Sequence, residues 1–143
     1  MSDQSPLRIA VIGVGHLGQH HARIYSSIDD VDLVGVVDID HERGKEIAEK
    51  YDTDFYPELD QIIDEIDAAS IVVPTEDHFK VGKQLIDAGV DCLIEKPMVQ
   101  TLEQAEQLYS LSEEGNVLLQ VGHIERFNTA FITAREYIDD PHY

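Results

Sequence analysis

Three glycines near the start of the chain have the spacing of a phosphate-binding loop. Residues 8–21 read R-I-A-V-I-G-V-G-H-L-G-Q-H-H, with glycines at Gly13, Gly15 and Gly18 directly after an apolar run. In such a loop the first glycine permits a tight turn, the second leaves room for a pyrophosphate, and the third lets a helix pack closely on a strand. The free N–H groups at the start of that helix hold the phosphates. The stretch predicts a dinucleotide site.

A carboxylate at the expected distance supports this interpretation. The second apolar run, residues 31–37, ends at Asp38, which lies 20 residues after Gly18. A carboxylate there accepts hydrogen bonds from the adenosine ribose and repels a 2′-phosphate, so the sequence favours NAD over NADP. Arg43 is close enough to keep NADP open as an alternative. Asp38 could instead cap the helix that is expected to start at His41.

Polar residues also follow the later apolar runs, where a parallel sheet binds its ligands. They are Pro74, Thr75, His78, Glu95, Lys96, His123, Arg126 and Asn128. Lys96 stands out, because a partly desolvated lysine can exchange a proton with a hydroxyl or carbonyl group. Pro97 restricts the backbone of Lys96 to extended geometry. The alternative is a surface lysine that is ion-paired with Glu95.

Apolar runs and amphipathic stretches alternate along the chain. The expected strands are Leu7–Gly13, Asp32–Asp38, Ala69–Val73, Val90–Ile94 and Val117–Val121, with a very short strand near Phe55. The expected helices are His16–Ile28, His41–Tyr51, Glu58–Glu65, Glu76–Ala88, Leu102–Glu114 and about Asn128–Ile138. This alternation predicts an α/β fold of Rossmann type, with a doubly wound parallel sheet in a single domain. That domain spans residues 1–122, and residues 123–143 form a crossing helix.

Residue types at the ends of these stretches suggest helix caps. Thr101, followed by Glu103 and Gln104, is typical of a helix start. Gly89 and Gly115 stand where helices commonly end in a glycine.

Composition excludes several classes of partner. The 143 residues include 29 acidic and 10 basic side chains, which gives a net charge of −19. Such a charge argues against binding to nucleic acid or to an anionic membrane. The single cysteine, Cys92, lies in an apolar run and is expected in the core, so no disulfide forms within one chain. Without a signal pattern or a long apolar run, a cytoplasmic protein is expected.

The histidines allow several roles. His16 belongs to the glycine loop, where its backbone matters more than its ring. His20 and His21 lie on the first helix, where packing or capping is favoured over catalysis. His123 follows a strand and either faces the site or is solvated. No paired spacing of histidine and carboxylate predicts a metal site.

Four motifs together resemble a known enzyme family. G-V-G-H-L-G-Q-H-H-A, V-P-T-E-D-H, E-K-P-M and G-H-I-E-R-F-N occur in the order and spacing of the glucose–fructose oxidoreductase / inositol dehydrogenase (Gfo/Idh/MocA) family. The resemblance covers residues 7–140. It implies an NAD(P)-dependent oxidation or reduction of a sugar or cyclitol hydroxyl. The tail V-G-H-I-E-R-F-N is most similar to members that act at C3 of UDP-linked amino sugars or uronates.

The resemblance implies a role for each matching residue. The pyrophosphate would be wrapped by Gly13, Gly15, His16, Leu17 and Gly18. The adenosine end would be held by Asp38 and Ile39, and the nicotinamide-side ribose would be lined by Pro74, Thr75 and His78. Glu95 would touch the cofactor near its reactive ring. Lys96, the candidate catalytic residue, would bond the substrate hydroxyl, beside a Lys96–Pro97 peptide that is cis in relatives. Arg126 would lie near the cofactor or a substrate phosphate.

The chain departs from the family in its length. Members are usually more than twice as long and carry a second α/β domain with a D-x-x-x-H motif. The expectation is therefore a cofactor-binding half that lacks the C-terminal substrate domain, binds NAD and does not turn over. Homo-oligomerisation is possible but not inferable. Phe127, Phe131 and Ile132 should then be exposed. The alternatives are a stand-alone NAD-binding sensor or scaffold and a Rossmann-like domain that binds no nucleotide.

Overall fold

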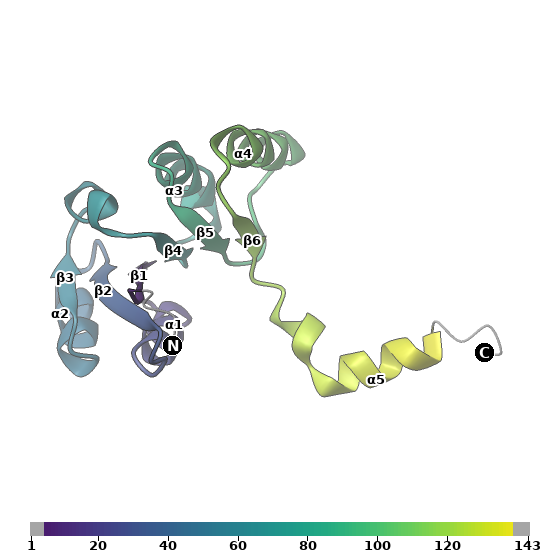
Figure 1. The fold of residues 1–143 in the computed structure, drawn as a ribbon, viewed down its shortest axis with the longest axis horizontal. Coiled ribbons are helices and arrows are strands. Elements are labelled where there is room, and N and C mark those ends of the chain that lie inside the picture. The colour runs from purple at the N-terminus through teal and green to yellow at the C-terminus, as the bar shows by residue number, and fades with distance from the viewer. Residues whose placement is uncertain (1–4, 139–143) are drawn as a thin grey trace.

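Within residues 5–138, which the computed structural model describes, six parallel strands form one sheet in the order β3-β2-β1-β4-β5-β6. The strands are β1 (Leu7–Ile12), β2 (Val31–Val37), β3 (Asp54–Tyr56), β4 (Ala68–Ile71), β5 (Asp91–Ile94) and β6 (Leu119–Val121). The α-helices are α1 (Gly18–Tyr25), α2 (His41–Lys50), α3 (Thr75–Asp87), α4 (Leu102–Gly115) and α5 (Thr129–Ile138). Figure 1 shows this arrangement, and the expected α/β fold with its short strand at Phe55 is confirmed.

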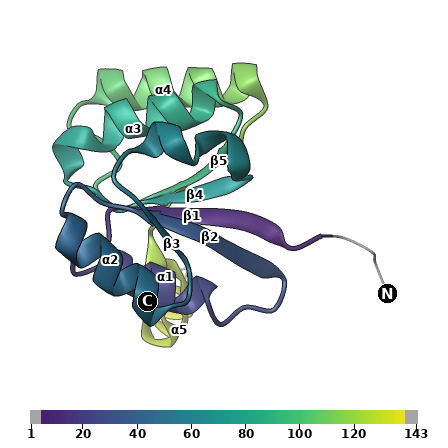
Figure 2. The same cartoon turned by 90° about the vertical axis from the view of Figure 1, so that its left-hand side faces the viewer.

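Helices cover both faces of the sheet and enclose a core on each. Figure 2 shows α3 and α4 above the sheet and α1 and α2 below it. Between the sheet and α3 and α4, buried residues include Ile71, Leu85, Ile94 and Leu108. The other core includes Val11, Val36 and Ile47. Residues 9–12 of β1 and 69–71 of β4 are all buried, so these two central strands are covered on both faces rather than on alternate residues.

The strand register brings the ends of the central strands into one row. Ile12 of β1 is paired with Val37 of β2 and with Ile71 of β4, and Ile71 is paired with Ile94 of β5. The residues that follow these strands are therefore neighbours. The chain winds in opposite directions on the two sides of β1 and β4, and a crevice at such a switch point is where sheets of this kind bind ligands.

Capping side chains explain where two helices begin. The carboxylate of Asp40 accepts hydrogen bonds from the backbone N–H groups of Glu42 and Arg43, so Asp40 caps α2. The alternative in which Asp38 is the cap is therefore wrong. Thr101 caps α4 as expected, with its Oγ1 3.3 Å from the Gln104 nitrogen.

The expected helix ends were right at Gly89 and wrong at Gly115. Gly89 takes the left-handed backbone, with φ of +77°, just after α3. Gly115 is instead the last residue of α4, and Asn116 has the left-handed conformation, with φ of 51°. Asparagine tolerates this conformation better than most residues.

Two expected helices are shorter or differently built. The helix expected over residues 16–28 runs only from Gly18 to Tyr25, because the glycine turn extends to residue 17 and Ser26 and Ser27 bond their hydroxyls back to main-chain carbonyls. The helix expected over residues 58–65 is two 3-10 turns, Leu59–Gln61 and Ile63–Glu65. That segment is too short to be stable as a helix by itself, and it has no side-chain cap.

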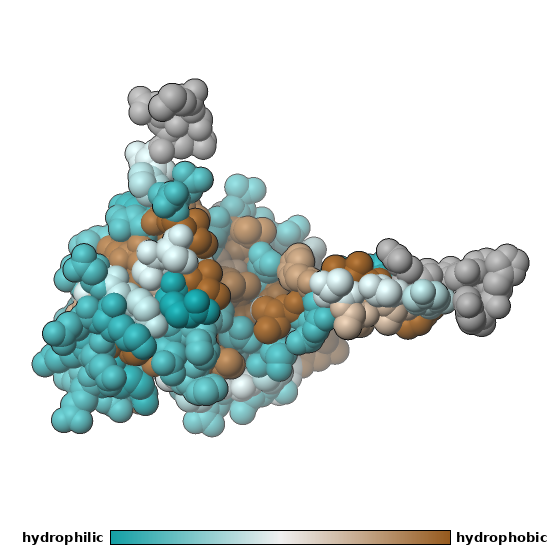
Figure 3. Space-filling model, turned by 90° about the horizontal axis from the view of Figure 1, so that it is seen from below, coloured by the Kyte–Doolittle hydropathy of each residue, from teal (hydrophilic) through white to brown (hydrophobic). Residues whose placement is uncertain are grey.

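The last helix, α5, projects away from the sheet and its covering helices, as Figure 1 shows. A 3-10 turn at Ile124–Phe127 links it to β6. Phe127, Phe131 and Ile132 are exposed, as expected. Figure 3 shows apolar surface on the projecting α5 and where this segment joins the rest of the molecule.

Candidate functional site

A cavity of about 850 Å³ opens over the carboxyl ends of β1, β2, β4 and β5. Its volume falls within the range of about 300–1,000 Å³ that is usual for ligand sites. Its lining includes Gly13, Gly15, Leu17, Asp38, Ile39, Pro74, Thr75, His78, Glu95 and Lys96. Of the expected cofactor residues, only His16, Gly18 and Arg126 do not line it. The structure thus brings together most of the residues selected from the ends of separate strands.

The glycine loop has the shape that its spacing predicts. Gly13 has φ of +86°, and a Cβ there would lie 2.8 Å from the Val72 carbonyl oxygen. A Cβ on Gly18 would lie 1.8 Å from the Gly13 oxygen, so helix α1 packs against the turn at a distance that only glycine allows. Gly15, in contrast, has no atom within 4 Å of a Cβ position and lines the cavity. Open space at Gly15 fits a bulky group such as a pyrophosphate.

The start of α1 is free of negative charge. No side chain caps it, and its first turn has no acidic residue. Each of α2, α3 and α4 has at least one acidic residue in its first turn: Glu42 in α2, Glu76 and Asp77 in α3, and Glu103 in α4. In a chain with a net charge of −19, this contrast leaves α1 as the helix N-terminus beside the cavity that is suited to an anion.

Asp38 is held in one orientation by four hydrogen bonds from its own chain. Its Oδ2 accepts from the Val14 nitrogen at 2.8 Å and from Arg43 Nε at 3.3 Å. Its Oδ1 accepts from the Asp40 nitrogen and from Arg43 Nη2, both at 2.8 Å. Burial of the carboxyl works to raise the pKa of Asp38, but the bonds from Arg43, Asp40 and Val14 outweigh burial and hold the pKa below its usual value. The carboxylate is therefore fixed and charged.

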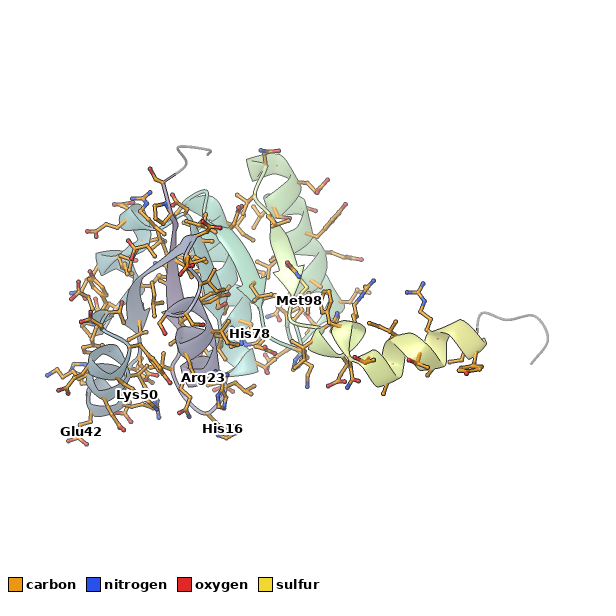
Figure 4. All side chains as sticks on the ribbon, turned by 60° about the horizontal axis from the view of Figure 1, so that its bottom comes forward. His16, Arg23, Glu42, Lys50, His78 and Met98 are labelled. Carbon is orange, nitrogen blue, oxygen red and sulfur yellow. The ribbon has the colours of Figure 1, made fainter. Side chains whose placement is uncertain are left out.

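His78 is buried in the wall of the cavity, and backbone carbonyl oxygens lie beside both of its ring nitrogens. Its Nε2 lies 2.9 Å from the Val73 oxygen, and its Nδ1 lies 3.0 Å from the Pro97 oxygen and 3.1 Å from the Met98 oxygen. Figure 4 shows His78 within the molecule, whereas His16 lies at its margin. His78 thus ties the end of β4 to the loop after β5, and its ring is already committed to backbone carbonyls.

Glu95 is the centre of a network that the sequence does not reveal. Its Oε1 lies 3.2 Å from His21 Nε2, and its Oε2 accepts a hydrogen bond from the Lys96 nitrogen at 3.1 Å. His21 Nδ1 lies 3.1 Å from Ser70 Oγ, which lies 2.7 Å from the Tyr25 hydroxyl. The three pairs of side chains in this network are 45 to 74 positions apart, so no local pattern could have identified them. His21 thus joins Ser70 to Glu95 through its two ring nitrogens.

Lys96 lies at the rim of the cavity with an exposed side chain. The Lys96–Pro97 peptide is cis, as the resemblance implies. Within residues 5–138, the Glu95 carboxylate pairs with His21 and not with the Lys96 ammonium. The alternative of a Glu95–Lys96 ion pair is therefore wrong for this part of the chain, and the amine is available at the cavity rim.

Arg126 and His123 lie elsewhere, beside β6 and α5. They line a second hollow of about 830 Å³ together with Leu119, Gln120, Val121, Phe127, Phe131, Ile132 and Arg135. The geometry therefore separates Arg126 from the other expected cofactor residues.

Other expectations concern metals, thiols and membranes. Across the described residues, no group of three or more histidine, cysteine or acidic side chains is placed to hold a metal ion. Cys92 is buried in the core as expected, and burial, followed by the charge of Asp91, raises its pKa to about 12. In the same part of the chain, no helix is both long and apolar enough to cross a membrane.

Comparison with known proteins identifies similar sequences. Residues 7–123 match an oxidoreductase family described by its NAD-binding Rossmann fold. Over 130 residues the chain is 42% identical to the UDP-N-acetylglucosamine 3-dehydrogenase of Acidithiobacillus ferrooxidans. This alignment covers 91% of this chain and 41% of that protein. Over 139 residues it is 33% identical to the scyllo-inositol 2-dehydrogenase (NAD(+)) of Bacillus subtilis. This second alignment covers 93% of this chain and 40% of that protein. The chain spans about two fifths of the length of these relatives.

Solved structures agree with this fold. The UDP-N-acetylglucosamine 3-dehydrogenase GnnA from Acidithiobacillus ferrooxidans superposes with a TM-score of 0.87 at 40% identity, over 94% of this chain and 44% of that one. GenD2 from gentamicin A biosynthesis, in complex with NAD, superposes with a TM-score of 0.93 at 30% identity, over 97% of this chain and 40% of that one. Both likenesses extend over nearly all of the 143 residues.

Proposed function

This chain belongs to the Gfo/Idh/MocA oxidoreductase family, and we propose that its 143 residues bind NAD for a dehydrogenase that oxidises a hydroxyl group of a sugar, a cyclitol or a nucleotide sugar. The observation that carries the proposal is the cavity in which an open Gly15, an uncapped α1 and a fixed Asp38 carboxylate meet. The space at Gly15 and the N-terminus of α1 match a pyrophosphate, and the Asp38 carboxylate matches a ribose.

The proposed cofactor lies along the row of strand ends. Gly13 to Gly18 and the start of α1 would hold the pyrophosphate, with Asp38 and Ile39 at the adenosine ribose. Neighbouring strands are about 4.8 Å apart, so the end of β2 with Asp38 and the end of β5 with Glu95 are separated by about 14 Å. An extended dinucleotide spans such a distance and would place its nicotinamide beside Glu95. Pro74, Thr75 and His78 would line that half of the cavity.

The pairing of Asp38 with Arg43 supports NAD as the preferred cofactor. A 2′-phosphate would approach a buried and charged carboxylate and would be repelled. Arg43, the residue that could attract such a phosphate, is already bonded to Asp38 through two nitrogens and lies 3.5 Å from an Asp40 oxygen. Its positive charge is therefore balanced by the protein itself.

Lys96 is the proposed catalytic residue. Bound NAD supplies the acceptor for the hydride that leaves the substrate carbon. The Lys96 side chain would hydrogen-bond the substrate hydroxyl at the cavity rim and assist the transfer of its proton. The hydrogen bond from the Lys96 nitrogen to Glu95 Oε2 would fix the root of this side chain.

The proposed substrate is a nucleotide sugar with an amino-sugar or uronate part, oxidised at C3. The similarity to UDP-N-acetylglucosamine 3-dehydrogenase over 91% of the chain supports this choice. Arg126 would then serve a substrate phosphate from the second hollow rather than the cofactor. A cytoplasmic location would suit such a substrate.

Titration of the 143-residue chain with NADH, followed by nicotinamide fluorescence, tests the cofactor proposal. Saturable binding is expected, and Asp38→Ala should weaken it by roughly 10- to 100-fold, because charge-assisted hydrogen bonds to the ribose are lost. Asp67→Ala is the matched control, since Asp67 pairs with Arg8 through the same two-point geometry but at the opposite end of the sheet. Absence of binding, or equal loss in both variants, would contradict the proposal.

The same 143-residue chain tests whether cofactor binding occurs without substrate turnover. With NAD and UDP-N-acetylglucosamine or scyllo-inositol it should bind the cofactor without forming NADH. Substrate oxidation at an ordinary enzymatic rate would show that residues 1–143 suffice for catalysis and would refute this part of the proposal.

A further inference from the structure

The network around Glu95 has a definite direction of hydrogen bonding. A carboxylate can only accept, so the His21 ring must carry its proton on Nε2 and donate to Glu95 Oε1. In the neutral ring Nδ1 then accepts from the Ser70 hydroxyl, and Ser70 in turn accepts from the Tyr25 hydroxyl. These hydrogen bonds follow one another from Tyr25 to Glu95, so the network fixes the tautomer of His21.

Glu95 is confined on its remaining sides. It is only 8% exposed, its second oxygen accepts from the Lys96 nitrogen, and Gly122 of the next strand end passes close behind it. A Cβ on Gly122 would lie 2.9 Å from Glu95 Oε1. Ser70 is fully buried in β4, so the network is anchored in the sheet itself. The carboxylate is therefore held at the cavity wall in one position.

We propose that His21 is a positioning residue that holds the Glu95 carboxylate against the nicotinamide end of the cavity and thereby raises the affinity for oxidised relative to reduced cofactor. This inference rests on the proposed function. The oxidised nicotinamide ring carries a positive charge and the reduced ring is neutral, so a fixed negative group nearby attracts only the oxidised form. In a partly desolvated site such an attraction amounts to a substantial difference in affinity.

Loss of His21 would remove this discrimination. The buried Glu95 would keep a single donor, the Lys96 nitrogen, and an under-bonded buried carboxylate either turns toward solvent or takes up a proton. Both responses withdraw negative charge from the nicotinamide end. A residue with a merely structural role would affect the binding of both cofactor forms equally.

Calorimetric titration of the full 143-residue chain with NAD+ and with NADH tests the proposal. Glu95→Gln and His21→Leu are each expected to lower the ratio Kd(NADH)/Kd(NAD+) by roughly tenfold. His21→Gln, which keeps a donor near the Nε2 position, should recover part of that ratio. Tyr25→Phe removes only the last hydroxyl of the network and should give a smaller shift in the same direction. It also provides a readout if His21→Leu does not fold, which far-UV circular dichroism would reveal.

His20→Leu is the matched control, because His20 is the neighbouring exposed residue of α1 and contacts His16 rather than Glu95. Its ratio should equal that of the unaltered chain. A ratio unchanged in Glu95→Gln, or both dissociation constants rising together in His21→Leu, would overturn the inference while leaving the NAD site intact. An unaltered chain that bound neither nucleotide would overturn the proposed function as well.

Discussion

The guanidinium of Arg43 lies across the carboxylate of Asp38, with Nη2 2.8 Å from Oδ1 and Nε 3.3 Å from Oδ2. Such a two-point pair fixes both groups. The acid that is proposed to favour NAD thus restrains the arginine that could favour NADP. The proposed cofactor preference would therefore depend on the pair and not on Asp38 alone.

Asp38→Ser should shift this preference. The variant removes the negative charge at the ribose and releases Arg43, so NADPH affinity should rise by roughly tenfold and NADH affinity should fall by a similar factor. Fluorescence titration with each nucleotide measures both constants. In the double variant Asp38→Ser/Arg43→Ala the gain for NADPH should disappear. A gain that persisted there would show that Arg43 is not the phosphate-binding group.

Gly15 and Gly18 should respond oppositely to alanine. Gly15→Ala meets no atom within 4 Å, so the free energy of unfolding should change little, while the new methyl group occupies the expected pyrophosphate space and weakens NADH binding roughly tenfold or more. Gly18→Ala would drive a methyl group into the Gly13 carbonyl and should cost roughly 1–3 kcal/mol of stability or more. Urea denaturation and NADH titration of both variants measure the contrast. Equal effects on stability would contradict it.

The depressed pKa of Asp38 predicts how stability depends on pH. Because the native pKa lies below the unfolded value of about 3.9, the paired carboxylate stabilises the fold above that pH, and this contribution is lost as pH falls through the native pKa. Asp38→Asn should thus lower the free energy of unfolding by roughly 1–3 kcal/mol at pH 7. The difference from the unaltered chain should vanish in acid.

Urea denaturation followed by circular dichroism from pH 3 to 7 measures this difference. Asp67→Asn is the control, because Arg8 also lowers the pKa of Asp67 but that pair is exposed. Its effect should be smaller at neutral pH and should decrease with added salt. A difference for Asp38→Asn that did not change with pH would exclude the assigned charge state.

The sequence predicted the row of strand ends because parallel strands place their carboxyl ends together. The runs before Gly13, Asp38 and Glu95 are mostly apolar and rich in valine and isoleucine, so strand, turn and site residue could be located from local pattern alone. The sheet register then made these residues neighbours. Local pattern also sufficed for the cap at Thr101.

Other features depend on contacts that no local pattern records. His21 meets Glu95 across 74 positions of sequence, so its partner emerges only from the packing of α1 on the sheet. At the end of α4, both Gly115 and Asn116 can adopt the left-handed conformation, and the chain uses Asn116. The segment before β4 buries Leu59 and Ile62 by forming two short 3-10 turns rather than a helix.

The exposed apolar residues on and beside α5 predict self-association of the 143-residue chain. Phe127 and Phe131 are 75% and 52% exposed, and they border one hollow with Ile132. Burying such surface gains about 25 cal/mol for each Å², whereas the net charge of −19 opposes contact between copies. Association should therefore rise with salt, which screens the charge.

Sedimentation velocity at several protein and salt concentrations measures this balance. The double variant Phe131→Ser/Ile132→Ser should shift the chain toward monomer by roughly tenfold in dissociation constant, because two apolar side chains leave the contact. Leu118→Ser is the control, since Leu118 is also an exposed apolar residue but lies outside that hollow. A chain that stayed monomeric at high salt and high concentration would show that this surface is too small or too mobile to bind a second copy.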